Sequence, residues 1–304
     1  MVISIIIPTK DRAEIFNETL ESVVQAIEGL AAEIIVINDS KSSEPPIPNR
    51  FKSVRLVTNS KSGVASARNL GASIAQSELL LFMDDDFLIT RESILRVIEF
   101  SSQHPRKIHL FNWIYPPSVQ ASLSATQFGR YMKAFGFTTL QGWLAEGWKE
   151  EEVFELKGGA SYFLPIRKVL FNEIGGYHES FPHAGAEDYY FIQEAGKKGI
   201  KFYVDKTCTL YHNEKDRLVI KKWLERKRRN GETLRMAVQL GRSEMAIHYT
   251  PYKSLLLSIL YKMRGFFLIS QKIVPNVTWL DPVYFKMTNI LLAAYIFNGY
   301  NKVR

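Results

Sequence analysis

Four short apolar runs in the first hundred residues constrain the fold of this chain most strongly. They are rich in Val, Ile and Leu, have the length of β-strands, and cover residues 2–7, 33–37, 54–57 and 79–83. Strands that are buried on both faces read as such nearly continuous apolar runs. The intervening segments 15–30 and 65–75 repeat apolar residues at helical spacing. This alternation of strand and helix predicts an α/β fold around a mostly parallel central sheet.

Polar residues follow each of the four runs. They are Pro8 to Arg12, Asn38 to Ser40, Thr58 to Gly63, and the triplet Asp84, Asp85 and Asp86. Ligands of open parallel sheets bind beyond the carboxyl ends of the strands, so we expect the binding site among these residues. The first run is followed neither by a Gly-x-Gly-x-x-Gly motif nor by a Gly-Lys-Ser/Thr loop. A dinucleotide fingerprint and a P-loop are therefore excluded at this point of the chain.

The triplet Asp84–Asp86 places three negative charges at the tip of an expected central strand. Neighbouring like charges raise one another's pKa unless a cation neutralises them, and a hard divalent metal with oxygen ligands suits such a cluster. The alternative is an acidic turn or the N-terminal cap of a helix over residues 91–100. On an extended segment, Asp84 and Asp86 point to the same side. We favour the metal site, with one carboxylate facing a nucleotide and the other the metal.

Two further candidates lie in the second half of the chain. Glu187 and Asp188 stand at the expected start of a helix that ends before Gly199. Acidic residues are favourable in any first helical turn, and a carboxylate behind a glycine-bearing loop is also placed to act as a general base. His212 ends the β-prone run 207–211. A histidine at a strand end is either structural or a metal ligand that supplements the Asp triplet.

Cysteine usage and the start of the chain indicate where such a protein works. The single cysteine, Cys208, excludes an intramolecular disulfide and a cysteine-based zinc cluster, which fits a reducing compartment. The first residues lack the basic segment and cleavage site of a secretory signal. The uncharged stretch 287–301 is shorter than the ~20 apolar residues of a membrane-spanning helix. We expect no membrane crossing.

Charge is distributed unevenly along the chain. The formal net charge is −4 over residues 1–200 and +12 over residues 201–304. Such asymmetry predicts that the C-terminal part meets a polyanion, either nucleic acid or an anionic lipid surface. Apolar helices with basic and aromatic residues are expected over 218–229, 252–273 and 283–300. They either lie in a lipid interface, or form a packed helical subdomain that can pair with a second subunit as a homodimer.

Seven short elements, taken in order, resemble glycosyltransferase family 2, a group of inverting nucleotide-sugar enzymes with the GT-A fold. The elements are Ser4–Thr9, Glu33–Ser40, Gly63–Gly71, Phe82–Asp86, Gly175–Glu179, Glu187–Asp188 and His212. The resemblance implies a GT-A catalytic domain over residues 1–213. Its donor-binding half would cover about 1–100 and its acceptor half about 101–213. It leaves 214–304 as a basic, apolar helical C-terminal region.

The resemblance also implies roles for single residues. Asp86 and His212 would bind Mn²⁺ or Mg²⁺, which stabilises the leaving nucleoside diphosphate as a Lewis acid. Asp188 would deprotonate the acceptor hydroxyl, and Glu187 would orient its loop. Gly159 would lie under the donor sugar, although a Gly158–Gly159 pair is also an ordinary turn before a strand. The nucleotide-sugar donor, with a UDP-sugar as first choice, would contact Pro8, Thr9, Asp11, Arg12, Asp39, Gly63, Arg68, Asn69, Asp84, Asp85 and Gly159.

The implied function is transfer of a sugar, with inversion, to a hydroxyl of a lipid-linked or cell-surface glycan. The enzyme would work in the cytoplasm, at the inner face of the cell membrane, with the aromatic segment 111–156 selecting the acceptor. One alternative is a GDP- or dTDP-sugar donor with a protein or small-molecule acceptor. Others are a catalytically silent GT-A binding module and a nucleic-acid-binding protein that uses residues 221–229. We expect no nucleic-acid partner, because zinc-finger spacing and RNA-recognition motifs do not occur in the sequence.

Overall fold

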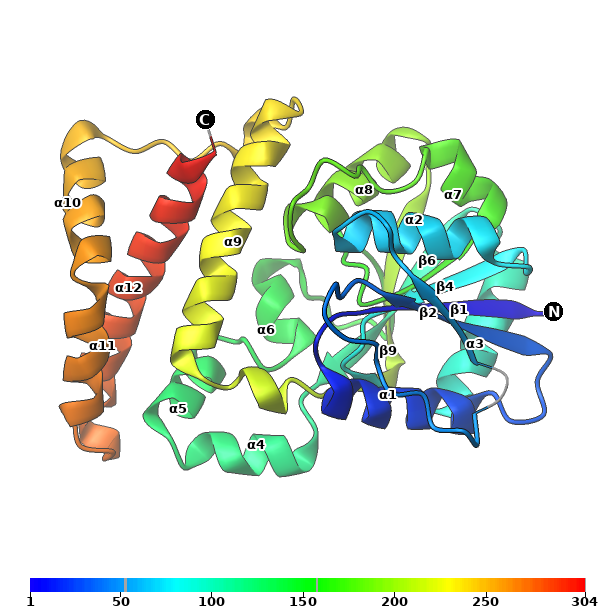
Figure 1. Ribbon diagram of the computed structural model, residues 1–304, viewed down its shortest axis with the longest axis horizontal. Coiled ribbons are helices and arrows are strands. Elements are labelled where there is room, and N and C mark those ends of the chain that lie inside the picture. Colours follow the sequence, from blue (N-terminus) through cyan, green and yellow to red (C-terminus); the bar gives the residue numbers. More distant parts are fainter. Residues whose placement is uncertain (52–53, 157, 304) are drawn as a thin grey trace. The chain divides into compact units, whose positions relative to one another are not determined.

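Contacts within the computed structural model divide the chain into two units (Figure 1). The structure describes residues 1–51, 54–156 and 158–303. The first unit comprises residues 1–116, 139–179 and 187–214. The second comprises residues 117–138, 180–186 and 215–304. The chain therefore passes from one unit to the other several times.

The first unit is built on a five-stranded sheet in the order β3-β2-β1-β4-β8. Its strands are β1 (Ile3–Thr9), β2 (Ala32–Asn38), β3 (Val54–Thr58), β4 (Leu79–Met83) and β8 (Phe163–Arg167). Every pair is parallel except β4 with β8. Thr9 pairs with Asn38, so β1 and β2 end at the same edge. The predicted α/β fold with a mostly parallel sheet is confirmed.

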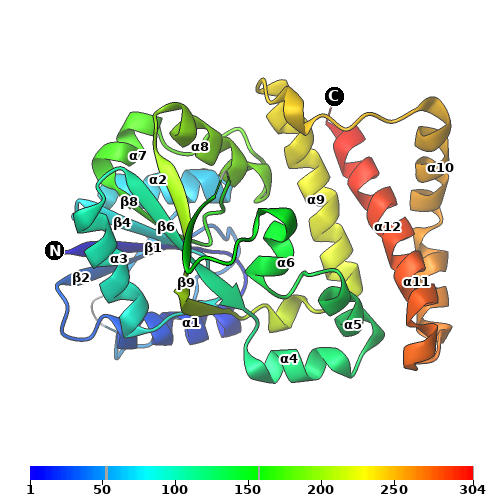
Figure 2. The same cartoon turned by 180° about the vertical axis from the view of Figure 1, so that it is seen from behind.

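Helices cover both faces of this sheet. Figures 1 and 2 show α2 on one side and α1 and α3 on the other. The helices of the unit are α1 (Ala13–Ala26), α2 (Val64–Ile74), α3 (Arg91–Gln103), α6 (Leu140–Leu144), α7 (Lys168–Ile174) and α8 (Ala186–Lys197). A Cβ atom at Gly71 of α2 would collide with Ile6 of β1. Glycine at this position lets α2 lie directly on the strand.

A second sheet brings the end of one strand to the Asp triplet. It contains β5 (Phe87–Leu88), β9 (Lys201–His212) and β6 (Lys107–Ile114), with β7 (Val153–Leu156) paired to β9. The strands β5 and β9 are antiparallel, and Phe87 pairs with His212. Because Phe87 directly follows Asp86, this pairing places His212 beside the triplet.

The second unit is helical. It contains α4 (Pro117–Ser124), α5 (Gln127–Ala134), α9 (Ile220–Gln239), α10 (Pro251–Lys262), α11 (Arg264–Ile273) and α12 (Asp281–Lys302). Its core joins Tyr131 of α5, Trp223 of α9 and Leu291 of α12. The helix expected over 252–273 is broken at Met263 into α10 and α11. Among the described residues, short 3₁₀ segments also lie at Ala145–Gly147, Lys215–Arg217, Ser243–Met245 and Thr278–Leu280.

The contacts group two segments differently from the predicted domains. Residues 117–138 and 180–186, which we assigned to the catalytic domain, belong to the same unit as the C-terminal helices. The boundary at residues 213 and 214 stays a prediction about independent folding. Within the described part of the chain, every helix is too short or too polar to cross a bilayer.

Candidate active site

The Asp triplet forms a turn at the end of β4. The chain turns at Asp85 and Asp86 instead of remaining extended, so the expected alternation of Asp84 and Asp86 on one side does not apply. The triplet also does not cap the next helix, because the side chain of Thr90 accepts the hydrogen bond that caps α3. The alternative of a helix cap was therefore wrong.

Asp85 points into the fold. Its Oδ2 accepts a hydrogen bond of 2.7 Å from Thr9 Oγ1, at the end of β1. Its backbone carbonyl accepts a hydrogen bond of 2.9 Å from Thr19 Oγ1 of α1. Thr9 and Asp85 therefore join the ends of β1 and β4, and their predicted contact with the donor stays a prediction.

Arg12 supplies a positive charge to the triplet. Its Nη1 lies 2.6 Å from Asp85 Oδ1 and 2.7 Å from Asp86 Oδ2. All three side chains are largely buried. Pairing offsets the repulsion between two buried carboxylates, which would otherwise be unfavourable. Arg12 was predicted as a donor-binding residue, and the structure shows it as a partner of the acidic cluster.

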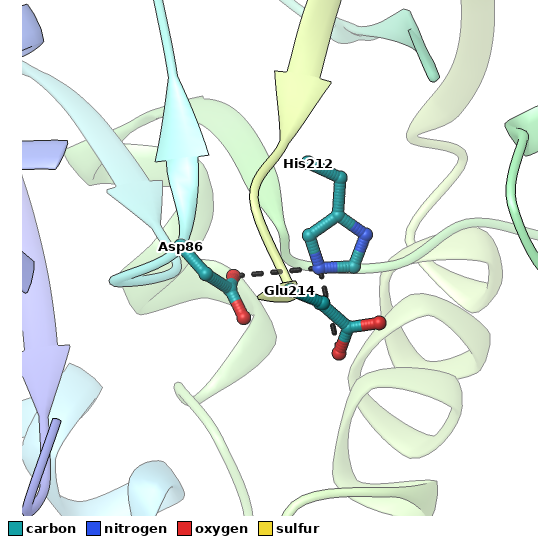
Figure 3. Close-up of side chains that lie close together, drawn as sticks. All are labelled: Asp86, His212 and Glu214. Carbon is teal, nitrogen blue, oxygen red and sulfur yellow. Dashed lines mark ion pairs between the residues drawn. The ribbon is translucent and has the colours of Figure 1, made fainter. Parts of the chain in front are cut away.

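Asp86, His212 and Glu214 form a group that can hold a metal ion (Figure 3). Each offers one ligand atom, and these atoms lie within 4.8 Å of one another. His212 Nε2 is 3.5 Å from Asp86 Oδ1 and 3.7 Å from Glu214 Oε1. Two carboxylate oxygens and one imidazole nitrogen suit Mn²⁺, and the oxygens suit Mg²⁺. The residues present therefore fit the predicted ion.

Neighbouring side chains hold this group in place. The His212 ring stacks on Phe87, with centroids 4.4 Å apart, and meets Trp113 edge-on. The hydroxyl of Tyr115 donates a hydrogen bond of 2.7 Å to Glu214 Oε2. Partners of this kind orient metal ligands and tune their basicity.

Glu214 is a candidate ligand that sequence reasoning missed. The predicted catalytic domain ended at Asn213, one residue before it. Glu214 lies beyond the end of β9 at His212, and its N–H donates a hydrogen bond of 3.2 Å to the His212 carbonyl, so the chain turns here. The alternation of side chains along an extended strand therefore does not select Glu214.

Arg68 of α2 links the triplet to the proposed base. Its Nη2 lies 2.9 Å from Asp84 Oδ1, and its Nη1 lies 2.8 Å from Asp188 Oδ1 and 3.2 Å from Glu187 Oε1. The guanidinium also lies over the ring of Tyr177, 5.1 Å from its centroid. Carboxylates that are 104 positions apart in the chain, Asp84 and Asp188, thus share one cation. The sequence predicted each of them without predicting this link.

Asp188 is held through both carboxylate oxygens. Oδ1 pairs with Arg68, and Oδ2 accepts a hydrogen bond of 3.1 Å from the backbone N–H of Ser161. The nearby Gly159 packs closely, since a Cβ there would lie 3.1 Å from Ile192 of α8 and 3.2 Å from Leu110 of β6. Gly159 therefore lets the chain before β8 approach α8, the helix that carries Asp188.

Burial and crowding shift the proton affinities in this network. Burial of its carboxyl group is the largest cause that raises the pKa of Asp84 to about 6, and the charges of Asp86, Asp188 and Asp85 add to it. Arg68 opposes this rise. Burial alone would lower the pKa of Arg68, but the carboxylates of Asp188, Asp84 and Glu187 outweigh it and the pKa is raised. The guanidinium stays charged, and Asp84, whose side chain is 38% exposed, is open to a ligand.

Asp39 lies at the end of β2 and orders the loop before α2. Its Oδ1 accepts hydrogen bonds of 2.9 Å from the Gly63 N–H and 2.7 Å from Asn59 Nδ2. Gly63 has a φ of +116°, which favours glycine. Asp39 Oδ2 lies 3.2 Å from Lys10 Nζ, a largely exposed cation. This second oxygen is the one placed to meet a ligand.

The remaining predicted donor contacts have local partners. Asp11, at a φ of +54°, accepts a hydrogen bond of 2.6 Å from Ser40 Oγ. Asn69 binds the turn after α7, through Tyr177 N–H and the Tyr177 carbonyl, both at 2.9 Å. Pro8 is buried within β1. Their contact with a donor stays a prediction.

Comparison with known proteins identifies the family of this chain. The sequence model described as glycosyl transferase family 2 matches residues 4–174, more than half of the chain. The chain belongs to glycosyltransferase family 2. The matched range contains β1, the Asp triplet and Arg68, whereas Glu187, Asp188, His212 and Glu214 lie beyond it.

Two curated glycosyltransferases match parts of the sequence. An uncharacterized glycosyltransferase of Haemophilus influenzae is 26% identical over 193 residues, which cover 63% of this chain and 60% of that protein. A poly(ribitol-phosphate) beta-glucosyltransferase of Bacillus spizizenii is 34% identical over 119 residues, which cover 36% of this chain and 19% of that protein. The matches thus span less than two thirds of either relative.

Two solved structures share the GT-A fold of this family 2 chain. S. aureus TarS aligns with all of this chain and 55% of its own, with a TM-score of 0.53 and 14% identity. GalNAc-T7, solved with UDP, GalNAc and Mn²⁺, aligns with 69% of this chain and 42% of its own, with a TM-score of 0.51 and 14% identity. At this identity the likeness concerns the fold.

Proposed function

We propose that this family 2 enzyme is a metal-dependent inverting glycosyltransferase that uses a nucleotide-sugar, with UDP-sugar as first choice. The observation that carries the proposal is the convergence of Asp86, His212 and Glu214, whose ligand atoms lie within 4.8 Å of one another. The solved relative that holds UDP and Mn²⁺ on the same fold supports this choice of ion and donor. Mg²⁺ is the alternative ion, and a GDP- or dTDP-sugar the alternative donor.

In this proposal Asp86, His212 and Glu214 hold the ion. When bound, the metal neutralises the diphosphate and stabilises the leaving nucleoside diphosphate as a Lewis acid. Arg12 keeps the second oxygen of Asp86 in place, 2.7 Å from its guanidinium. Asp39 Oδ2, whose partner Lys10 is largely exposed, and the exposed part of Asp84 accept hydrogen bonds from the nucleoside.

Asp188 accepts the proton of the acceptor hydroxyl, whose oxygen then attacks the anomeric carbon. Attack from the face opposite the leaving group inverts the configuration. Arg68 and the Ser161 N–H fix the orientation of the carboxylate, at 2.8 Å and 3.1 Å. Each carboxylate oxygen has a second lone pair, so both contacts leave Asp188 able to accept the proton. Glu187 supports this arrangement through Arg68 and takes no proton.

For the acceptor we propose a hydroxyl of a lipid-linked or cell-surface glycan. The curated relative named for poly(ribitol-phosphate) supports a polymer acceptor. We also propose that the protein works in the cytoplasm and contacts the inner face of an anionic cell membrane peripherally through its C-terminal helices. A protein or small-molecule acceptor and a homodimer are the alternatives.

A thermal-shift screen tests the donor and the metal. A ligand that binds only the folded state stabilises it, by about 2.7 kcal/mol at a hundredfold excess over its Kd. We expect UDP to raise the melting temperature with Mn²⁺ present, and Asp86→Asn to abolish this shift. The absence of a shift with any nucleoside diphosphate, under either metal, would remove the donor-binding proposal.

The variant Asp188→Asn tests the base. We expect it to keep the shift by UDP and Mn²⁺ and to lose transfer by about a hundredfold or more, since general bases contribute at least that much. Transfer is measured as release of nucleoside diphosphate with acceptor present. Equal loss of binding and transfer would argue against Asp188 as the base.

A further inference from the structure

One side of α10 and α11 exposes a row of large apolar side chains. They recur every third or fourth residue and are Tyr252, Leu255, Leu256, Ile259, Met263, Phe266, Ile269 and Ile273. This spacing places them on one side of each helix. Tyr252 and Ile273, at the two ends of the row, are 77% and 75% exposed. We call these eight side chains the apolar face.

The opposite side of the same helices is packed. Figures 1 and 2 show α10 and α11 following one another alongside α12. Leu257 of α10 is buried against Ala294 and Phe297 of α12. Gln271 of α11 donates a hydrogen bond of 2.8 Å to Thr288 Oγ1 of α12. The apolar face is therefore held by an ordered helical packing and is not the surface of a loose tail.

The segment that carries the apolar face has charged residues of a single sign. Residues 245–280 contain no Asp or Glu, but they contain Lys253, Lys262, Arg264 and Lys272. The amino groups of Lys253, Lys262, Lys272 and Lys286 form no ion pair with a carboxylate in the described residues. By contrast, Arg228 of α9 pairs with Glu225 and Glu232 at 2.6 Å. The lysines near the apolar face thus remain available to an anionic partner.

A groove between α10 and α12 combines apolar walls with two of these lysines. Its volume is about 560 Å³. Leu256, Leu260, Phe285 and Ile290 contribute apolar walls, and Lys253 and Lys286 line the same groove. An apolar chain that ends in a negatively charged head group matches this combination. Trp279, between α11 and α12, is 76% exposed, and indole rings favour the region between lipid head groups and hydrocarbon.

We propose that the apolar face is the surface on which this enzyme lies on an anionic lipid bilayer, with the groove receiving one lipid between Lys253 and Lys286. Helices with an apolar side and basic flanks lie in the plane of the bilayer interface, where lysines extend toward the head groups. The inference rests on the proposed membrane contact and assigns it to particular residues. The inference predicts that binding to an anionic bilayer needs both the apolar side chains and the lysines that form no ion pair with a carboxylate.

Sedimentation of the full chain with vesicles tests this assignment. We expect binding to vesicles that contain phosphatidylglycerol, weak binding to phosphatidylcholine alone, and a decrease with added salt. The triple variant Leu255→Gln, Phe266→Gln, Ile269→Gln is expected to bind about tenfold more weakly or worse. Its control is Leu95→Gln with Val169→Gln, which removes exposed apolar side chains from the first unit. The control should bind as the unchanged protein does.

A second pair of variants tests the groove. Lys253→Gln with Lys286→Gln should weaken binding to phosphatidylglycerol vesicles about tenfold and leave binding to phosphatidylcholine unchanged. Lys221→Gln with Lys222→Gln removes the same charge from α9 and should have a smaller effect. Brominated lipids should quench tryptophan fluorescence in the unchanged protein and quench it less in Trp279→Phe.

The outcomes separate this inference from the proposed function. A UDP and Mn²⁺ shift that is unchanged in all these variants shows that the donor site is intact. The membrane assignment is wrong if the protein does not bind vesicles, or if the triple variant and its control bind them equally. Either result would leave the transferase proposal unaffected. If the triple variant instead converts a dimer to a monomer at equal vesicle binding, the face is an interface between two copies and the inference is wrong.

Discussion

At the scale of single residues, Arg68 balances the negative charges of the candidate active site. It is buried together with Glu187 and compensates Asp84 and Asp188 as well. Removing one partner of a buried ion pair leaves an uncompensated charge, which typically costs about 3–5 kcal/mol. We therefore expect Arg68→Met to lower the free energy of unfolding by about 3 kcal/mol.

A double variant tests whether the loss of stability in Arg68→Met comes from the uncompensated charge or from disturbed packing. Glu187→Gln added to Arg68→Met removes a buried negative charge and should recover part of the lost stability. Denaturant unfolding without nucleotide measures the coupling between the two positions. Additive effects of the two substitutions would show that the Arg68–Glu187 contact, at 3.2 Å, contributes nothing of its own.

Single residues also differ in how far their place in the site could be predicted from the sequence. Asp86, His212 and Asp188 became candidates because each follows a strand or lies in the first turn of a helix, and such positions can be recognised in the sequence. Glu214 was missed because its role depends on Tyr115, 99 positions earlier, and on the pairing of β5 with β9. The neutralisation of Asp85 and Asp86 by Arg12 depends on a turn that replaces an extended segment. Contacts between distant residues of this kind leave no local pattern.

At the scale of elements, β6 carries a histidine inside the core. His109 is buried between Phe100 and Phe111, and within the described residues neither ring nitrogen has a hydrogen-bond partner. Burial is the main cause that lowers its pKa to about 4, and Arg96 and His104 lower it further against the effect of Asp205. The imidazole ring of His109 is therefore neutral in the folded protein at pH 7.

The sign of the pH effect follows from this shift. Between the ordinary pKa of about 6.5 and the folded value of about 4, the unfolded chain binds more protons than the folded one. Stability contributed by neutral His109 is present at pH 7.5 and is lost as the pH falls toward 4, by up to about 3 kcal/mol. His109→Phe should flatten the loss of unfolding free energy between pH 7 and pH 5. His248→Phe, at an exposed position, should not.

The crossing of α9 and α12 depends on two glycines. A Cβ at Gly299 of α12 would collide with the carbonyl oxygen of Arg228, and a Cβ at Gly231 of α9 would collide with that of Ile296. Backbone atoms cannot move away as a flexible side chain does. We expect Gly299→Ala to destabilise the protein by about 1–3 kcal/mol. In α11, Gly265 has no atom within 4 Å of such a Cβ, so Gly265→Ala should stabilise by up to about 1 kcal/mol.

Thermal unfolding measures these opposite changes in stability, as a lower melting temperature for Gly299→Ala and a higher one for Gly265→Ala. A melting temperature that rises in both variants would mean that α9 and α12 separate easily enough to admit a methyl group.

The elements of the first unit were predicted better than those of the second. The strands of the parallel sheet are continuous apolar runs, and each was located within about two residues. The aromatic segment 111–156 was expected to select the acceptor, and no helix was predicted in it, but α4 and α5 lie within it. Their apolar side chains, such as Phe128 and Tyr131, are buried against Trp223. Sequence alone does not show that a segment pairs with helices about a hundred residues later.

At the scale of the whole molecule, this interleaving bears on the predicted boundary at residues 213 and 214. A fragment 1–213 keeps α5 but loses α9 and α12, which cover Phe128, Tyr131 and Met132. We expect this fragment to expose the aromatic side chains, to bind a hydrophobic dye and to aggregate. Replacing Phe128 and Met132 by Gln in the fragment should reduce dye binding. A fragment 1–213 that is monomeric and binds no dye would instead support the predicted boundary as a true domain end.

The loop before Asp188, the proposed base, is anchored in the same helical unit. The Ala186 N–H donates a hydrogen bond of 3.2 Å to Thr233 Oγ1 of α9, and His183 Nε2 lies 3.1 Å from Glu232 Oε2. The next two residues along the chain are Glu187 and Asp188. Protein engineers who graft the C-terminal helices of one family member onto another would therefore need to transplant residues 117–138 and 180–186 with them. A chimera joined at a single point near residue 214 would take Asp188 from one parent protein. It would take Thr233 and Glu232, which anchor the loop before Asp188, from the other.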